Sequence, residues 1–331
     1  MLNTTDPQVK FALNAVRQAS LLVRQVQLDL VSPALTKNDR SPVTVADFAS
    51  QALIGNLLKQ SFPDDPLVAE EDSSALREPD AAETLEQVRS FTARFAGDCD
   101  AESVLSWIDH GRVDTARRFW TLDPIDGTKG FLRGEQYAVA LALIEDGQVQ
   151  IGVLGCPNLV DAYRPDAASY GSLVIAVRGQ GCWVTPLDRP GEFERLRVSK
   201  RTNPEEARIL RSVESGHTNV DQIDQFAAAL GVRVEPVRMD SQGKYSVLAA
   251  GKGELVMRLL SPAKPDYKEK IWDQAAGSIV VEEAGGKITD LSGRPLDFTC
   301  GRSLLNNRGI LASNGLLHEA AVEALQRIGA Q

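Results

Sequence analysis

The feature that most constrains the fold is a group of apolar runs in the middle of the chain, arranged as two pairs with a short turn inside each pair. The first pair, 137–144 and 149–154, encloses Glu145-Asp146-Gly147, which is typical of a hairpin turn. The second pair, 172–177 and 179–184, has the same arrangement. Because hairpins join antiparallel strands, these runs predict a largely antiparallel sheet.

Two helices that precede the hairpins are expected to cover this sheet. Residues 7–30 carry apolar side chains at helical spacing without an internal glycine or proline, which predicts an amphipathic helix. A second helix is expected to begin at the cap residue Thr44 and to be followed by a short strand at 67–69. The polar stretch at 73–118 predicts one helix, at 82–95, and is interpreted as a candidate lid or flap.

The pattern changes after Lys200, where strand and helix candidates alternate and a last helix is expected at 272–284. The candidates lie at 208–213, 220–230, 232–237, 245–250 and 255–258. Such alternation is typical of a second layered α/β unit. We therefore expect two domains, an N-terminal α+β domain at 1–200 and a C-terminal α/β domain at 201–331.

Composition and charge exclude several classes of protein. The 331 residues include 36 Lys and Arg against 45 Asp and Glu, a net charge of −9, which disfavours a broad nucleic-acid surface but permits a small anionic substrate. No apolar run approaches 18 residues and the first ten residues are polar, so neither a membrane span nor a signal peptide is expected. The four cysteines form no C-x-x-C pair, which favours a reducing, cytoplasmic location without a disulfide framework. His110 and His318 are interpreted as surface residues.

The most informative segment is WTLDPIDGTKG at 120–130. Asp123 ends an apolar run, Pro124 restricts the backbone, and Asp126 follows in the turn. Two carboxylates at this spacing can converge on one hard cation, with the carbonyl of Ile125 as a third oxygen. A helix that begins near Thr128 would direct free N–H groups at the same point, which suits a phosphate. The same residues also suit an ordinary surface turn.

Three further acids lie at the edges of apolar elements. Glu70 follows the strand expected at 67–69, Asp273 opens the last predicted helix, and Asp47 follows Thr44 by three residues. Each has an ordinary alternative, since Glu70 can be a solvated acid, Asp273 a carboxylate at a helix N-terminus, and Asp47 part of a capping box. Together with the 120–130 segment, these acids favour one shared site.

Three motifs in order, the pair Glu70-Glu71, DPIDGT at 123–128 and WDQAAG at 272–277, resemble the signature of the inositol monophosphatase-like phosphatases, which depend on Mg²⁺ and are sensitive to Li⁺. Three others resemble the 3′(2′),5′-bisphosphate nucleotidase branch of that superfamily: KNDRSPVT at 37–44, GTKGFLRGEQ at 127–136 and MDSQGKY at 239–245. The similarity extends from the first helix to Asn314, although Ala69 stands where members usually carry glycine. It implies a layered αβαβα sandwich of the inositol monophosphatase and fructose-1,6-bisphosphatase type.

The resemblance also implies roles for individual residues. Those that would bind Mg²⁺ are Glu70, Asp123, the carbonyl of Ile125, Asp126 and Asp273. A hydrogen-bonded pair, Asp47 and Thr128, would help to deprotonate the attacking water. Those that would contact substrate are Gly127, Thr128, His217, Ser241, Lys244, Arg258 and Asp273.

Two of these substrate contacts also make sense from their chemistry. Lys244 and Arg258 are suitable partners for a phosphate that is not cleaved. Both have alternatives, since Lys244 can be a solvated lysine and Arg258 a surface charge. His217 can likewise be an ordinary loop histidine.

The expected function is therefore a Mg²⁺-dependent phosphomonoesterase that converts adenosine 3′,5′-bisphosphate to AMP and phosphate by in-line attack of metal-activated water. The sulfated precursor of this nucleotide is a further candidate substrate, and Li⁺, with Na⁺ as a second candidate, is expected to inhibit. Two alternatives are an inositol phosphate or polyphosphate phosphatase and a non-catalytic nucleotide sensor. The expected partner is a small phosphorylated nucleotide, without nucleic acid or membrane.

Overall fold

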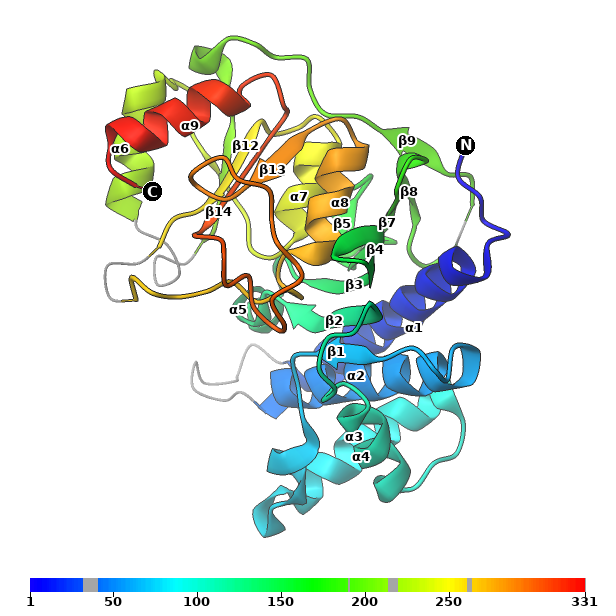
Figure 1. The fold of residues 1–331 in the computed structure, drawn as a ribbon. Helices are drawn as coiled ribbons and strands as arrows, with labels where there is room; N and C mark the ends of the chain where they lie inside the picture. The colour runs from blue at the N-terminus through cyan, green and yellow to red at the C-terminus, as the bar shows by residue number, and fades with distance from the viewer. Residues whose placement is uncertain (32–40, 190, 214–219, 261–263, 331) are drawn as a thin grey trace.

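The computed structural model describes all residues except 32–40, 190, 214–219, 261–263 and 331. Helical and sheet layers alternate through the molecule (Figure 1). Helices α1 (Pro7–Leu30) and α2 (Ser41–Ser61) cover one face of a seven-stranded sheet. In order through the remaining layers follow α7 (Gly243–Ala249) with α8 (Ala275–Glu283), a five-stranded sheet, and α6 (Val220–Leu230) with α9 (His318–Arg327). The αβαβα sandwich expected from the sequence is confirmed.

The seven-stranded sheet is antiparallel except at one edge, where β1 pairs parallel with β2. Its strands, in spatial order, are β1 (Leu67–Ala69), β2 (Arg118–Asp126), β3 (Ala138–Glu145), β4 (Gln148–Cys156), β7 (Ser172–Val177), β8 (Gly181–Pro186) and β9 (Glu194–Leu196). Both predicted hairpins, β3–β4 and β7–β8, are present. Alternation along β3 sends Val139 and Leu141 into the core beneath α1 and α2, and the small side chains of Ala140 and Ala142 toward α8.

The five-stranded sheet is mixed, and its strands, in spatial order, are β11 (Val237–Arg238), β10 (Ile209–Arg211), β12 (Leu255–Arg258), β14 (Ile310–Ser313) and β13 (Lys287–Thr289). A separate ribbon joins β5 (Leu159–Val160) and β6 (Arg164–Pro165). The strand expected at 232–237 is confined to its last residue and Arg238, because the preceding valines pair with no strand in the described part of the chain and Val234 is exposed. Every strand of the first sheet precedes residue 200 and every strand of the second follows it, so we keep the division at residue 200 as a proposal.

The polar stretch at 73–118 forms more structure than expected. It contains the 3₁₀ turns η1 (Ser73–Arg77) and η2 (Pro79–Ala81) and the helices α3 (Ala82–Ala96) and α4 (Ala101–Asp109). The second helix was not predicted, although Asp100 caps it by accepting the N–H of Ser103 at 2.8 Å. Both helices pack on α2 (Figure 1), so the segment covers a helix and the lid or flap interpretation is wrong.

The surface position expected for His318 is also wrong, because this residue is only 1% exposed. Its two ring nitrogens lie 2.9 Å from the hydroxyl oxygens of Thr289 and Ser313, which satisfy the imidazole inside the fold.

Helix α2 begins earlier than its predicted cap, at Ser41 rather than Thr44. All four cysteines are free. In the described part of the chain, no helix is both long and apolar enough to cross a bilayer.

Candidate active site

Parallel pairing of the first two strands brings two acids together. Ala69 pairs with Leu122, and the N–H of Glu70 donates to the carbonyl of Leu122 at 3.3 Å. Glu70 therefore leaves the end of β1 beside Asp123 of β2. The register of β2 against β3 then shifts between Asp123 and Asp126, at the Pro-Ile step, so that both acids occur near the end of one strand.

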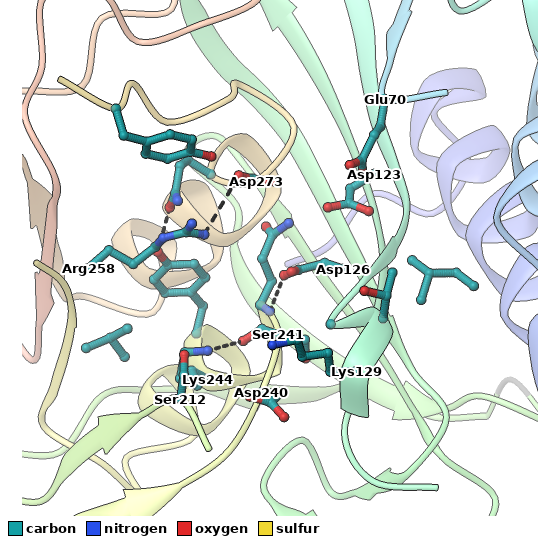
Figure 2. A pocket seen from close by; sticks show the side chains of 18 residues that line it. Glu70, Asp123, Asp126, Lys129, Ser212, Asp240, Ser241, Lys244, Arg258 and Asp273 are labelled. Carbon is teal, nitrogen blue, oxygen red and sulfur yellow. Dashed lines mark hydrogen bonds and ion pairs between the residues drawn. The ribbon is translucent and has the colours of Figure 1, made fainter. Parts of the chain in front are cut away.

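These acids share one pocket with basic residues. The pocket has a volume of about 250 Å³ and lies between the end of β2, the turn before α7 and the segment before α8. In Figure 2, Glu70 and Asp123 lie on one wall, Arg258 and Lys244 lie on the other, and Asp126 lies between them. The polar lining residues include Glu70, Asp123, Asp126, Thr128, Lys129, Ser212, Asp240, Ser241, Gln242, Lys244, Arg258, Tyr267, Asp273 and Gln274.

Burial and mutual repulsion raise the pKa values of the acids. Burial, followed by the charge of Asp273, raises the pKa of Glu70 to about 8, although Glu70 lies at the mouth of the pocket and retains solvent contact. Burial also raises the pKa of Asp273 to about 7, even though Arg258 favours its charged form. Burial and the charges of Glu70, Asp126 and Asp273 raise the pKa of Asp123 well above its ordinary value. The cluster therefore has more negative charge than the protein itself neutralises.

A divalent cation would supply the missing positive charge. Oδ1 of Asp123 and Oδ1 of Asp47 are buried and have no hydrogen-bond partner among the described residues. Carboxylate oxygens are the ligand atoms that hard cations prefer. Within the residues that the structure describes, however, no three His, Cys, Asp or Glu side chains are already arranged to hold one ion. The acids thus fit a metal in type and position, and their carboxylates would have to turn toward a common point.

Asp47 and Thr128 are not paired as expected. Asp47, on α2, is 7% exposed, and burial, Glu71 and Glu70 raise its pKa well above the ordinary value. Thr128 begins the short helix α5 (Thr128–Leu132) and lines the pocket, whereas Asp47 does not line it. Among the described residues no hydrogen bond joins the two, and Oδ1 of Asp47 has no partner there.

Two of the three nucleotidase-like motifs, at 127–136 and 239–245, lie in loops that touch each other, and the motif at 37–44 begins outside the described residues. Gly127 has a left-handed backbone with φ of +91°, and a Cβ atom there would come within 2.8 Å of Cβ of Ser241. Ser241 itself has φ of +69°, which is strained for a residue other than glycine. The next N–H, that of Gln242, donates to Oδ2 of Asp126. Direct contact therefore couples the acidic turn after β2 to the turn before α7.

Lys244 and Arg258 are buried or half-buried cations on the wall opposite Glu70 and Asp123 (Figure 2). Lys244 is 8% exposed, and its ammonium donates to the carbonyl of Ser241 at 2.9 Å. Burial lowers the pKa of Lys244 to about 8. The guanidinium of Arg258 lies 3.1 Å from Glu269 and 3.7 Å from Asp273, and these carboxylates raise its pKa despite burial. His217 lies outside the described residues.

Several lining residues escaped the sequence reasoning. Ser212 and Asp240 follow the parallel strands β10 and β11, whose carboxyl ends meet at one edge of the sheet. This topology was the available signal for Ser212, whereas Asp240 also lies inside the recognised motif at 239–245. Gln242 lies inside a motif that was recognised, and it links both pocket helices by donating to Trp272 O and accepting from Gly277 N, each at 3.0 Å.

Fold and site together define a family. Residues 5–330 match the sequence model of the inositol monophosphatase family, and the chain therefore belongs to this metal-dependent family. Among solved structures, the inositol monophosphatase of Zymomonas mobilis matches with a TM-score of 0.63 at 20% identity, covering 98% of this chain and 100% of that one. An inositol monophosphatase of Thermotoga maritima matches with a TM-score of 0.62 at 22% identity, covering 97% and 98%.

Two relatives have a higher sequence identity to this chain than these solved structures do. A Schizosaccharomyces pombe protein named 3′(2′),5′-bisphosphate nucleotidase is 41% identical over 338 residues, covering 96% of this chain and 95% of the relative. An Oryza sativa protein of the same name is 42% identical over 343 residues, covering 98% and 95%. The resemblance inferred from the motifs is confirmed.

Proposed function

We propose that the protein hydrolyses the 3′-phosphate of adenosine 3′,5′-bisphosphate to give AMP and phosphate, with the sulfated precursor as a further candidate substrate. The observation that carries this proposal is one pocket in which an acidic cluster faces Lys244 and Arg258. A substrate with two phosphates matches such a pocket, because one phosphate can be cleaved at the acids while the cations hold the other. The names of the full-length relatives support the same substrate.

The acidic cluster is the proposed Mg²⁺ site. The residues that would hold the metal are Glu70, Asp123, the carbonyl of Ile125, Asp126 and Asp273. Mg²⁺ bound there would lower the pKa of a water molecule and neutralise the phosphoryl oxygens. Li⁺, with Na⁺ as a second candidate, is proposed to inhibit. The excess negative charge and the unpartnered Oδ1 of Asp123 support this assignment.

Asp47 and Thr128 are proposed to take up the proton of the attacking water. The raised pKa of Asp47 supports this role, because a carboxylate with a higher pKa is a stronger base. Thr128 lines the pocket, and its hydroxyl would relay the proton to Asp47. Their side chains would need to turn toward each other, since they are not hydrogen-bonded here.

The second phosphate is proposed to bind Lys244 and Arg258. In the described part of the chain, the ammonium of Lys244 makes one hydrogen bond, to Ser241 O, which leaves two of its three donors for an anion. Arg258 is held in place by Glu269 while its guanidinium borders the pocket. Four further residues are proposed substrate contacts on the motif resemblance: Gly127, His217, Ser241 and Asp273.

A substrate comparison tests the proposal. Phosphate release from adenosine 3′,5′-bisphosphate, with Mg²⁺, is expected to be much faster than release from inositol 1-phosphate, and Li⁺ is expected to suppress it. Lys244→Met should raise KM for the bisphosphate about 10- to 100-fold, because it removes a charged contact of about 1.5–3 kcal/mol. Lys252→Met is the matched control, since Lys252 packs over Tyr163 and does not line the pocket.

Two results would refute the proposal. Faster turnover of the inositol ester would favour the inositol phosphatase alternative. Tight nucleotide binding without phosphate release would favour the sensor.

A further inference from the structure

We propose that Arg302 is a positioning residue that joins the two arms carrying Glu70 and Asp273 and thereby sets the affinity of the acidic cluster for divalent cations. The first arm is the end of β1 through Glu70, and the second arm is the segment 269–273 before α8. The proposal rests on the metal site described under the proposed function. Neither the motifs nor the pocket lining include Arg302.

The side chain of Arg302 binds the first arm. Its Nη2 donates to the carbonyl of Ala69, the residue directly before Glu70. Its Nη1 lies 3.4 Å from the carbonyls of Gly111 and Val113. These belong to the loop beside β1, where the Gly111 carbonyl also accepts the N–H of Ala69 at 2.9 Å. One guanidinium therefore binds both the end of β1 and the loop that borders it.

The backbone around Arg302 binds the second arm. The N–H of Ile271, two residues before Asp273, donates to the carbonyl of Arg302 at 3.2 Å. The N–H of Leu304 donates to the carbonyl of Glu269 at 2.9 Å, so that 302–304 runs alongside the second arm. In addition, the guanidinium carbon of Arg302 lies 4.9 Å from the ring centroid of Trp272. The same residue thus contacts both arms, which are about 200 positions apart in the sequence.

A connection of this kind is needed because the acids repel one another. Glu70, Asp123, Asp126 and Asp273 line one pocket, so their negative charges lie close together. Without a cation, that repulsion separates the arms unless another contact opposes it. Arg302 opposes it without occupying either carboxylate, since the three hydrogen bonds that its side chain donates to described residues all end on backbone carbonyls. Both acids therefore remain available to a metal.

The residue that follows the first arm, Glu71, is held by helix α2. Gln51 of α2 accepts the N–H of Glu71 at 3.0 Å and donates to the carbonyl of Glu71 at 2.6 Å. Glu70 is thus flanked by Ala69, which Arg302 holds, and by Glu71, which Gln51 holds. The contact from α2 ties the arm to its own domain, whereas Arg302 provides the contact to the Asp273 arm.

Arginine suits this position better than lysine. A planar guanidinium presents donors in fixed directions to several acceptors and stacks on an aromatic face, whereas an ammonium does neither to the same degree. Contacts that orient metal-binding residues without touching the metal typically change metal affinity 10- to 100-fold when removed. We expect an effect of about this size for Arg302→Met, and a smaller one for Arg302→Lys.

The test measures the midpoint of a calorimetric Mg²⁺ titration without substrate, which is the free Mg²⁺ concentration that half-saturates the site, together with Tm in the presence and absence of Mg²⁺. Arg302→Met should raise this midpoint about 10- to 100-fold, and Arg302→Lys should raise it several-fold. Arg208→Met is the control, because Arg208 also forms a cross-strand contact, with Glu254 at 3.0 Å, but neither residue lines the pocket. The control should lower Tm and leave the midpoint unchanged. At saturating Mg²⁺, the KM of the Arg302 variants should match that of the wild type.

The outcomes separate this inference from the proposed function. A wild-type midpoint in Arg302→Lys or in a folded Arg302→Met, with normal Mg²⁺ stabilisation of the wild type, would overturn the positioning role alone. A wild type that gains no stability from Mg²⁺ would overturn the metal site and the positioning role together. A raised midpoint in Arg208→Met as well would show general loosening and would also overturn the inference.

Discussion

Asp273→Asn should make the metal-free protein more stable at alkaline pH while removing its phosphatase activity. The carboxylate of Asp273 is 16% exposed and close to other acids, and these surroundings raise its pKa from 3.8 to about 7. An acid whose pKa is raised on folding destabilises the folded state once it is ionised. Asparagine has nearly the same shape and carries no charge, so it removes this cost.

The size of the stabilisation by Asp273→Asn follows from the rise in the pKa of Asp273 on folding. Each pKa unit corresponds to about 1.36 kcal/mol, so the shift from 3.8 to about 7 amounts to about 4 kcal/mol when Asp273 is fully ionised. Neighbouring acids exchange protons with it, which reduces the expected gain to about 2 kcal/mol. The folded pKa is above the unfolded one, so stability is complete below about pH 4 and is lost as pH rises to about 7. The advantage of the variant should therefore grow over that window and then level off.

Thermal unfolding with EDTA at about pH 4 and pH 8 measures this difference. The variant should have a Tm about 2–4 °C above that of the wild type at pH 8 and nearly the same Tm at pH 4. Asp297→Asn is a control of opposite sign, since hydrogen bonds from Thr299 and Asn306 lower the pKa of Asp297 to about 2. That change should lower Tm at pH 8. A lower Tm for Asp273→Asn at pH 8 would refute the electrostatic reasoning.

Three further changes test other parts of the structure. Asp126→Asn should abolish turnover but raise the metal-free Tm less than Asp273→Asn does. The reason is that neighbouring basic side chains offset part of the cost of burying the Asp126 carboxylate. A rise in Tm equal to or larger than that of Asp273→Asn would contradict this. Gly277→Ala should destabilise by about 2 kcal/mol or more, since its Cβ would lie 2.0 Å from the buried ring of Tyr245. The control Gly191→Ala should be nearly neutral when both variants are unfolded with denaturant, because its Cβ would meet only the carbonyl oxygen of Arg189 among the described atoms, at an ordinary contact distance of 3.9 Å. His318→Gln should reduce the loss of stability between about pH 6.5 and pH 4 by up to about 3 kcal/mol. Burial lowers the pKa of His318 to about 4, so protonation favours unfolding below the ordinary pKa of histidine. Acid denaturation identical to that of the wild type would contradict this.

Local patterns in the sequence predicted much of the fold. The bounds of α1 and α6 agree with the predicted helices at 7–30 and 220–230, because apolar periodicity and flanking turns are local signals. Both hairpins were predictable for the same reason. Helix α4 was missed because it is short and follows another helix within a polar stretch.

The acids of the site were predictable, but their surroundings were not. Asp123 and Asp126 stand in one recognisable motif, and strand pairing then places Glu70 beside them. By contrast, the contact of Arg302 with Ala69 joins residues 233 positions apart, and no local pattern reports such a contact. The burial of His318 likewise depends on hydroxyl groups that the tertiary fold brings to it.

The central claim is that the separate acids form one binding site for divalent cations, and locating bound Mn²⁺ by anomalous diffraction in crystals tests it most directly. The account predicts anomalous peaks between Glu70, Asp123, Asp126 and Asp273, with the Ile125 carbonyl as a further ligand. No peak in this pocket, or peaks only at other surface carboxylates, would contradict it.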